Sequence, residues 1–567
     1  MGELPVKKFI LPLENSSHDT TQQPTQQQLP PTEEIIANIF ASLLGTQTVS
    51  IHDNFFELGG HSLLATQLTS RLRQALNREI PLRQIFENPT VAQLHNSLSQ
   101  QQPTQQQLPP IQPVDKPSHI PLSFAQERLW FLNQLQGESA TYNIPAAIQI
   151  NGELDTNALE QALAEIVRRH QTLRTSFPTD NGTPKQLIHP HTTINIKHID
   201  LQHLETTETQ TIIKQQTQQE AITPFQLETA PLIRCSLLQP APTEHILLLT
   251  MHHIISDGWS TGILIKELTT LYTAFSKKEP SPLPELALQY ADYSLWQRQW
   301  LTEQTRETQL QYWSNQLQNA PQTLQLPTDH TRPSIQTHRG RNHTVTINQQ
   351  TTQQIQKLSG QTGTTIFMTL LAAFATLLYR YSGQTDILIG SPIANRHHVE
   401  IEPLIGFFVN TLVLRTQIEQ NSTFTQLLSQ VRETTLKAYE NQDIPFEQLV
   451  EALQPQRSLS YSPLFQVMFV LQNNPTEELE LPGLTCSVLE SENTNAKFDL
   501  TLSVSETKQG LVCEWEYNTG LFEQATIERM ANHYENLLNS LVANPEQAVS
   551  EIDILSGAEK QKILPIS

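Results

Sequence analysis

The sequence MHHIISDGWS occupies residues 251–260, and the expected fold is built outward from it. Upstream, the apolar, branched run from Ile246 to Met251 predicts a short buried strand. Downstream, a helix is predicted with Ser260 as its N-cap. Its apolar face is formed by Leu264, Leu268, Leu271 and Phe275. The two histidines and the aspartate are therefore expected on a strand-to-helix connection, where a rigid scaffold often presents functional side chains.

Two adjacent histidines stand at the end of the predicted strand. Neighbouring residues of an extended chain point to opposite faces, so only one of His252 and His253 can face a given cavity. The pattern alone does not decide which one. A lone histidine would more often be a structural core residue. Two histidines, an aspartate and a glycine in one register form a more specific signal.

This segment resembles the HHxxxDG signature of condensation domains in nonribosomal peptide synthetases. Chloramphenicol acetyltransferase and related acyltransferases share the signature more loosely. The other motifs of the family follow in its order, at Ser123–Trp130, Arg169–Thr175, Tyr290–Trp296, Ile405–Thr411, Asn441–Glu447 and Arg457–Leu464. Three positions depart from the family pattern: Gln171 stands where an acidic residue is usual, and Ser458 and Tyr461 replace a common Asp and Arg.

Helix and strand patterns alternate through this region, which indicates an α/β fold. The predicted elements are helix 155–170, strand 246–251, helix 365–379, strand 386–391 and helix 424–439. The resemblance implies two chloramphenicol-acetyltransferase-like lobes with the histidine motif in the cleft between them. We expect the lobes at residues 119–300 and 301–554, with their boundary near Trp300–Thr331.

A smaller helical unit is predicted at residues 32–99. Within it, DNFFELGGHSLLA at residues 53–65 resembles the peptidyl carrier motif of peptide synthetases. Gly59 and Gly60 keep side chains away from Ser62, which opens a predicted helix, where free N–H groups favour a phosphodiester. An ordinary serine N-cap is the alternative. The resemblance implies a small four-helix-bundle carrier with 4′-phosphopantetheine attached to Ser62.

The decapeptide QQPTQQQLPP occurs at Gln22–Pro31 and again at Gln101–Pro110. Such tracts cannot bury a core and are typical of extended linkers. We therefore expect an N-terminal linker at residues 1–31 and a second linker at 100–118. Residues 555–567 resemble the start of a linker to an adenylation domain that the chain lacks.

Peptide-bond formation needs an amine held against an activated carbonyl, with its proton removed and water excluded. An imidazole can accept or orient that proton at neutral pH. The resemblance gives this role to His253, gives His252 and Asp257 structural roles, and lets Gly258 keep the channel open. We hypothesise that Asp257 pairs with Arg396 and so braces the loop. No metal is expected.

The predicted reaction is attack by an acceptor aminoacyl amine on a donor aminoacyl or peptidyl thioester carried by Ser62. The flanking motifs resemble the subtype that joins two L-residues. Epimerisation of a carrier-bound residue and a catalytically silent recruitment platform are the alternatives; heterocyclisation is disfavoured because paired aspartates replace the HHxxxDG pattern there. The implied partners are upstream and downstream adenylation domains, a downstream acceptor aminoacyl-carrier and a phosphopantetheinyl transferase.

Composition excludes some classes of partner. The formal charge of −21 argues against nucleic acid, whose phosphates require a basic surface. The 3 cysteines show no paired or metal-binding spacing, and the N-terminus lacks the apolar stretch of a signal peptide. The longest apolar segment, Ile366–Tyr379, is too short to span a bilayer. A reduced, cytoplasmic protein without membrane contact is expected.

Overall fold

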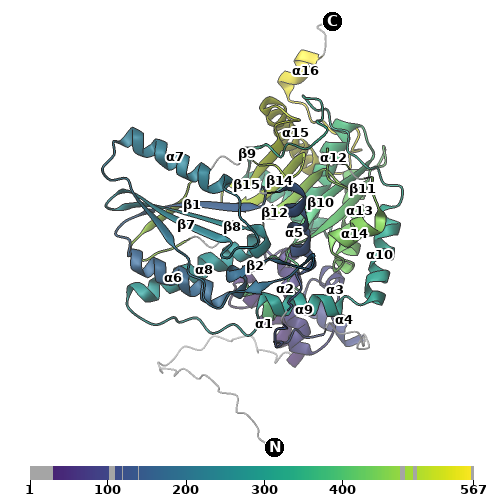
Figure 1. The fold of residues 1–567 in the computed structure, drawn as a ribbon. Helices are drawn as coiled ribbons and strands as arrows, with labels where there is room; N and C mark the ends of the chain where they lie inside the picture. The colour runs from purple at the N-terminus through teal and green to yellow at the C-terminus, as the bar shows by residue number, and fades with distance from the viewer. Residues whose placement is uncertain are drawn as a thin grey trace, which may run out of the picture.

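The computed structural model describes residues 30–100, 109–117, 119–137, 139–456, 458–472, 479–489 and 495–563. The fold is mixed α/β. A small helical unit lies beneath a larger body with two main sheets, and α16 (Gly557–Ile563) projects at the opposite end (Figure 1). Most of the first copy of QQPTQQQLPP and of the predicted 1–31 linker, and much of the second copy, lie outside the described residues.

The small unit contains four helices in its described part, as its apolar spacings predict. These are α1 (Pro31–Leu44), α2 (Ser62–Leu76), α3 (Leu82–Glu87) and α4 (Val91–Gln100). Gly45 ends α1 in the left-handed conformation at φ 66°, which glycine adopts without steric cost. Phe40, Phe55 and Leu68 are fully buried in the shared core. The long segment between α1 and α2 is therefore held in place by Phe55.

The first lobe is built on a five-stranded sheet with the order β13-β1-β8-β7-β6. Its strands are β1 (Asn143–Asn151), β6 (Ile196–Asp200), β7 (Ile233–Ala241), β8 (Glu244–His252) and β13 (Thr485–Val488). The strand predicted before the histidines is the central strand β8, paired antiparallel to β1 and β7. Nearly all of β8 is buried, as its continuous apolar run requires.

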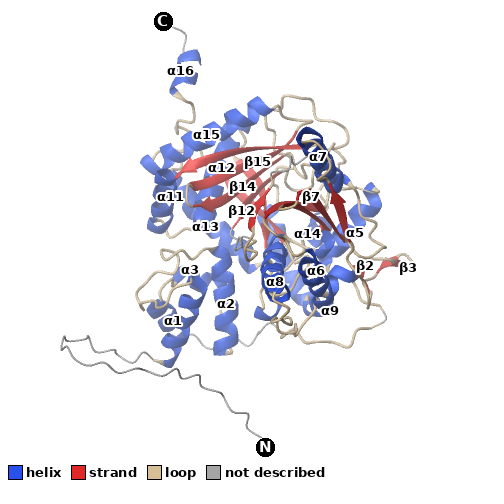
Figure 2. Cartoon of the chain, turned by 90° about the vertical axis from the view of Figure 1, so that its left-hand side faces the viewer, coloured by secondary structure: helices blue, strands red, loops and turns tan. Residues whose placement is uncertain are grey.

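Helix α7 (Thr206–Ile222) packs on one face of this sheet, and α6 (Thr156–Arg169) and α8 (Gly258–Ser276) lie on the other (Figure 2). Helices α5 (Phe124–Gln136) and α9 (Tyr290–Trp300) contact both lobes, and α10 (Glu303–Leu317) packs against residues 446–453 of the second lobe. Two-residue strands lie between α6 and β6: β2 (Thr175–Ser176), β3 (Thr179–Asp180), β4 (Thr183–Pro184) and β5 (Leu187–Ile188).

The second lobe is built on a six-stranded sheet with the order β11-β10-β12-β14-β15-β9. Its strands are β9 (Gly340–Asn348), β10 (Asp386–Ile393), β11 (Asn410–Gln417), β12 (Val467–Gln472), β14 (Leu500–Thr507) and β15 (Gly510–Asn518). Its helices are α11 (Gln349–Gln361), α12 (Ile366–Ser382), α13 (Phe424–Glu440), α14 (Phe446–Leu453) and α15 (Gln524–Ala543). The buried helix α12 contains most of the longest apolar segment.

One strand from the second half of the sequence joins the sheet of the first lobe. Strand β13 leaves the second half of the sequence and pairs with the edge strand β1 of the first sheet, with Ile148 opposite Val488. A single lobe boundary near residue 300 does not predict that β13 joins the first sheet. Strand β13 is only four residues long and partly exposed, so it carries no clear sequence signal. This pairing ties the two lobes together at the end of β1 that lies opposite Glu244–Leu247 of β8.

No single helix in the described ranges is long and apolar enough to cross a bilayer. Helices α11 and α12 pass that test only as a pair, and they are bent by 106° where they meet. The apolar side chains of α12 pack inside the second lobe.

Candidate active site

The histidine loop connects β8 to α8 through a short 3-10 turn at His253–Ile255. Helix α8 begins at Gly258, and its N-cap is Asp257, whose Oδ1 accepts a 2.9 Å hydrogen bond from Ser260 N. The prediction of Ser260 as the N-cap was therefore wrong by three positions. Asp and Ser are comparably good caps, and the turn before Asp257 places the aspartate at the first free N–H groups.

His253 is the histidine that faces a cavity. Its Nδ1 lies 2.8 Å from the carbonyl oxygen of Ser256, which can only accept, so Nδ1 carries the proton and Nε2 keeps its lone pair. Its ring packs edge-on against Phe407 at 4.8 Å between centroids. Burial, and then the charge of Lys497, lower the pKa of His253 to about 3. The imidazole is therefore neutral at pH 7.

His252 has a different environment. It is buried, and its Nδ1 accepts a 3.1 Å hydrogen bond from the backbone N–H of Ile254. Its ring packs near Tyr142 and Phe225. Burial, and then the neighbouring His253, lower the pKa of His252 to about 3. His253 thus lines the cavity, whereas the His252 ring packs among side chains of the first lobe.

Asp257 and Arg396 form the ion pair that the sequence hypothesis required. Arg396 Nη2 lies 3.3 Å from Asp257 Oδ1, and both side chains are almost completely buried. Asp257 Oδ2 accepts a 3.0 Å hydrogen bond from Phe408 N. Arg396 Nη1 donates to the carbonyl oxygens of Ile401 and Leu404, each at 2.7 Å. The pair therefore joins the histidine loop of the first lobe to residues 401–408 of the second.

The loop that carries Phe407 is packed with no spare room. A Cβ on Gly406 would lie 2.1 Å from the Tyr290 ring. Ser260 Oγ donates to the carbonyl oxygen of Gly406 at 2.9 Å, and Gly406 N in turn lies 3.0 Å from that hydroxyl. Gly258, the first residue of α8, lines the cavity beside His253.

Ser62 lies at the N-terminus of α2, directly after its N-cap His61. The Nδ1 of His61 accepts from Leu64 N at 3.4 Å, and a Cβ on Gly60 would clash with Phe55 at 2.4 Å. Ser62 Oγ is shielded from solvent and makes no hydrogen bond of normal geometry within the described residues, although the Tyr439 phenol approaches it. A buried hydroxyl without such a bond at a helix N-terminus fits a serine that carries a phosphodiester.

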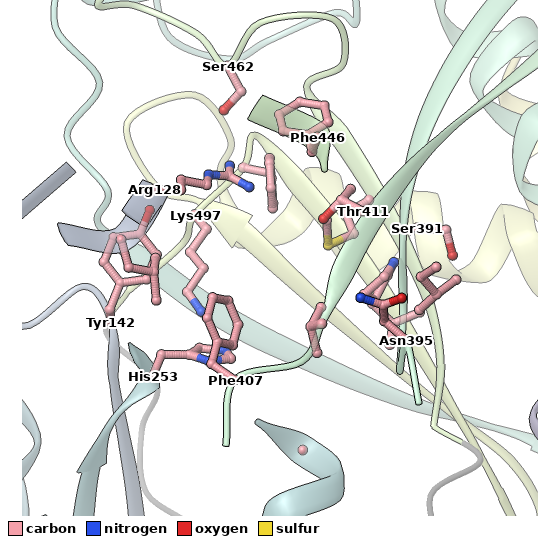
Figure 3. Close-up of a pocket in the computed structure, with 18 of the residues that line it drawn as sticks. Arg128, Tyr142, His253, Ser391, Asn395, Phe407, Thr411, Phe446, Ser462 and Lys497 are labelled. Carbon is pink, nitrogen blue, oxygen red and sulfur yellow. The ribbon is translucent and has the colours of Figure 1, made fainter. Parts of the chain in front are cut away.

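A cavity of about 1470 Å³ connects the serine with the histidine, since both line it. Its wall is formed by the carrier-like unit, by α5 and β1 of the first lobe, and by residues of the second lobe. Figure 3 shows His253, Phe407, Tyr142 and Lys497 gathered at one end of this cavity, with Arg128 and Ser462 further along the wall. Lys497, Tyr142 and Arg128 were not anticipated from the sequence as site residues.

The helical unit contacts the second lobe next to the cavity. Helix α3 lies against α13, and Arg83 reaches Glu433 at 3.0 Å and Glu440 at 2.6 Å. From α2, Arg71 pairs with Glu402 at 3.5 Å, and Ser70 Oγ donates to the carbonyl oxygen of His397 at 3.0 Å. Polar contacts therefore surround the point where Ser62 enters the cavity wall.

The described residues contain no group of three or more His, Cys, Asp or Glu side chains that could hold a metal ion. The site combines a neutral imidazole that lines a large cavity with a serine hydroxyl in the wall of the same cavity. This arrangement suits proton handling and binding of a tethered substrate.

Two family models match the chain. The model described as "Condensation domain" matches residues 116–564, and the model described as "Phosphopantetheine attachment site" matches residues 34–97. A linear gramicidin synthase of Brevibacillus parabrevis is 48% identical over 538 residues, which are 94% of this chain and 7% of that protein. Malpinin synthetase of Mortierella alpina is 43% identical over 94% of this chain and 7% of its own length. The chain thus spans a small part of these curated relatives.

Solved structures share the fold of the larger body. An X-domain solved in complex with OxyB from teicoplanin biosynthesis has a TM-score of 0.73 and 28% identity, over 80% of this chain and 99% of that one. The first condensation domain of the calcium-dependent antibiotic synthetase has a TM-score of 0.66 and 20% identity, over 78% of this chain and 100% of that one. The second likeness concerns the fold alone.

Proposed function

The chain belongs to the condensation-domain family of nonribosomal peptide synthetases, as a peptidyl carrier–condensation didomain, and from this membership we propose that it forms a peptide bond. In the proposed reaction, the amine of an acceptor aminoacyl-carrier attacks the thioester carbonyl of a donor bound to this chain. The donor is an aminoacyl or peptidyl group, and both joined residues have the L-configuration, as in the subtype that the flanking motifs resemble.

One observation carries the proposal: Ser62 and His253 line the same cavity although 191 positions separate them in the sequence. The attachment domain indicates covalently bound 4′-phosphopantetheine, which supplies a flexible arm and an activated thioester. We place it on Ser62, whose buried hydroxyl at the start of α2 suits a phosphodiester. The cavity would then guide the donor toward the imidazole and keep bulk water away from it.

In this proposal, His253 is the proton acceptor. Its Nδ1–H is committed to Ser256 O, so Nε2 is free to hold or accept the proton of the attacking amine. General-base help is worth about 10² to 10⁴ in rate, and orientation contributes separately. Asp257 has its carboxylate oxygens committed to Ser260, Phe408 and Arg396, which favours a bracing role over contact with substrate.

The proposed partners follow from the family. Upstream and downstream adenylation domains would activate the amino acids, a downstream carrier would present the acceptor, and a phosphopantetheinyl transferase would modify Ser62. The relatives are far longer than this chain, which leaves room in them for such neighbours.

A recruitment platform without catalysis is the second candidate, supported by the likeness to an X-domain solved in complex with OxyB. The intact histidine loop and the cavity beside it favour catalysis over this alternative. Epimerisation remains a third reaction open to this loop. Exchange of the Cα hydrogen of the loaded residue for deuterium, without any dipeptide, would identify epimerisation.

The test is a single-turnover reaction read by intact-mass analysis. Ser62 is loaded with a labelled donor, and an aminoacyl-loaded acceptor carrier is added. We expect a dipeptide on the acceptor with the unmodified protein, a loss of about 10² to 10⁴ in rate with His253→Ala, and no loading with Ser62→Ala. The matched control is His198→Ala, a half-exposed histidine on β6. Equal transfer by His253→Ala would refute the assignment.

A further inference from the structure

Lys497 lies three residues before β14, in a segment whose backbone is held by hydrogen bonds. Its carbonyl oxygen accepts a 3.2 Å hydrogen bond from Gln336 Nε2. Before Lys497, the backbone N–H of Ala496 donates to His338 O at 2.9 Å. After it, the backbone N–H of Asp499 donates to Gln466 O at 3.0 Å, and the Asp499 carboxylate pairs with Arg332. The backbone of Lys497 therefore has little freedom, and its side chain has a defined direction.

That direction is into the cavity, toward the imidazole. Figure 3 shows the side chain of Lys497 extending from the second lobe so that its nitrogen ends beside His253 and Phe407. The ammonium lies 5.4 Å from the centre of the Tyr142 ring, and the carbonyl oxygen of Tyr142 accepts from His253 N at 2.8 Å. Lys497 and His253 therefore face the same space from opposite lobes.

The ammonium of Lys497 has no ion-pair or hydrogen-bond partner among the described residues; its closest defined contact is the face of Tyr142. Arg128, another cation in the wall, is already paired with Glu447 at 3.1 Å. Burial lowers the pKa of Lys497, and the charge of Glu516, a residue of β15 that lines the cavity, opposes this shift. An ammonium that is removed from most of the solvent, with no carboxylate of the described residues at ion-pair distance, is costly, which indicates that it serves a ligand.

We propose that Lys497 is a catalytic residue that donates a hydrogen bond from Nζ to the carbonyl oxygen of the donor thioester. This inference rests on the proposed function. As the acceptor amine forms the N–C bond, the carbonyl π electrons move to oxygen, where the ammonium stabilises them. When they return, the C–S bond breaks and the sulfur leaves with its electron pair. The proton lost by nitrogen passes by way of His253 to that sulfur, so charge and atoms balance.

Lys497 and His253 then have different roles in the proposed reaction. The cation of Lys497 acts on developing negative charge, and the same cation helps to keep the His253 imidazole neutral and able to accept a proton. Arg128 cannot take the first role while Glu447 neutralises it. A single positive group placed at the carbonyl is typically worth about 10² to 10³ in rate in a water-excluded site.

The kinetic test compares Lys497→Met, which keeps the apolar stem, with Lys497→Arg, which keeps a positive donor. In single turnover with donor-loaded Ser62, we expect Lys497→Met to lower the maximal rate by about 10² to 10³ with an unchanged half-saturating acceptor concentration. Lys497→Arg should recover part of that loss. The control is Lys508→Met on the exposed β14–β15 turn. A Lys497→Met rate within about threefold of the unmodified protein would overturn the proposal.

A spectroscopic test needs no turnover. The donor carbonyl is labelled with ¹³C on loaded Ser62, no acceptor is added, and its stretching band is isolated by isotope-edited infrared difference. We expect the band at lower frequency in the unmodified protein than in Lys497→Met, because a hydrogen bond to oxygen weakens the C=O bond. An identical band in both would exclude the contact. If the unmodified protein makes no dipeptide but the band shifts, the proposed reaction fails while the contact at Lys497 stands.

Discussion

At the scale of single residues, the protonation of His253 has a consequence for pH dependence. Its folded pKa of about 3 lies below the ordinary histidine value, so the ring stays neutral from pH 5.5 to 8. We therefore expect no inflection near pH 6.5 from this residue in the single-turnover rate. The rate should instead rise with pH through the pKa of the acceptor amine, because only the free amine attacks.

The measurement is the pH–rate profile with two acceptors whose amines differ in pKa. We expect the inflection to follow the amine from one acceptor to the other. An inflection near pH 6.5 that stays fixed when the acceptor is changed, and that disappears in His253→Ala, would show that the imidazole titrates normally.

One residue-scale hypothesis can be compared directly with the structure. Asp257 of the histidine motif was expected to pair with Arg396, and the structure places their charged groups 3.3 Å apart. Lys497 could not be anticipated as a site residue. Its position depends on the backbone contacts of Gln336 and Asp499 and on packing against Tyr142, none of which is local in sequence.

At the scale of elements, helices α2 and α3 present the serine to the cavity. Arg83 bridges Glu433 and Glu440 across this contact, and these carboxylates raise its pKa. Its side chain is 24% exposed, so the pairs are partly screened and worth about 0.2–1 kcal/mol each. We expect Arg83→Glu to weaken docking by about 1 kcal/mol, roughly a fivefold shift in the docked-to-undocked ratio.

Single-molecule fluorescence transfer between a dye on α4 and a dye on α15 measures this ratio. The matched control is Arg78→Glu, an arginine of the same helical unit whose guanidinium donates to Leu98 O within that unit. Raising the salt concentration should also lower the docked-to-undocked ratio of the unmodified protein, because salt screens these ion pairs. Equal populations for Arg83→Glu and the unmodified protein would show that these pairs do not hold the helices in place.

The strands and helices themselves were largely predictable, because buried runs and amphipathic spacings are local signals. Strand β8, predicted at 246–251, extends over Glu244–His252, and the helix predicted at 424–439 is α13 at Phe424–Glu440. Strand β13 was not predicted, since four partly exposed residues carry no periodic signal. The tight fit of Gly406 against Tyr290 explains a motif glycine that the sequence alone left unexplained.

At the scale of the whole molecule, the histidine loop is assembled from both lobes. Phe408 N and Arg396 from the second lobe bind Asp257 of the first, and Ile405 N donates to His170 Nδ1 at 3.3 Å. The family motifs that are far apart in sequence therefore meet around one loop. Their order could be read from the sequence, whereas the docked position of the helical unit could not, because it depends on contacts between exposed surfaces.

The central claim is that an arm rooted on Ser62 reaches the space beside His253 within one molecule. The most direct test loads Ser62 with a phosphopantetheine that ends in a chloroacetyl group and introduces a thiol by Phe407→Cys, beside the imidazole. A thiol introduced by Leu187→Cys, 44% exposed on the first lobe, is the control. Peptide mapping by mass spectrometry then locates the thioether. We predict an intramolecular link to position 407 and none to 187; a loaded protein without that link, or with links only between molecules, would contradict the account.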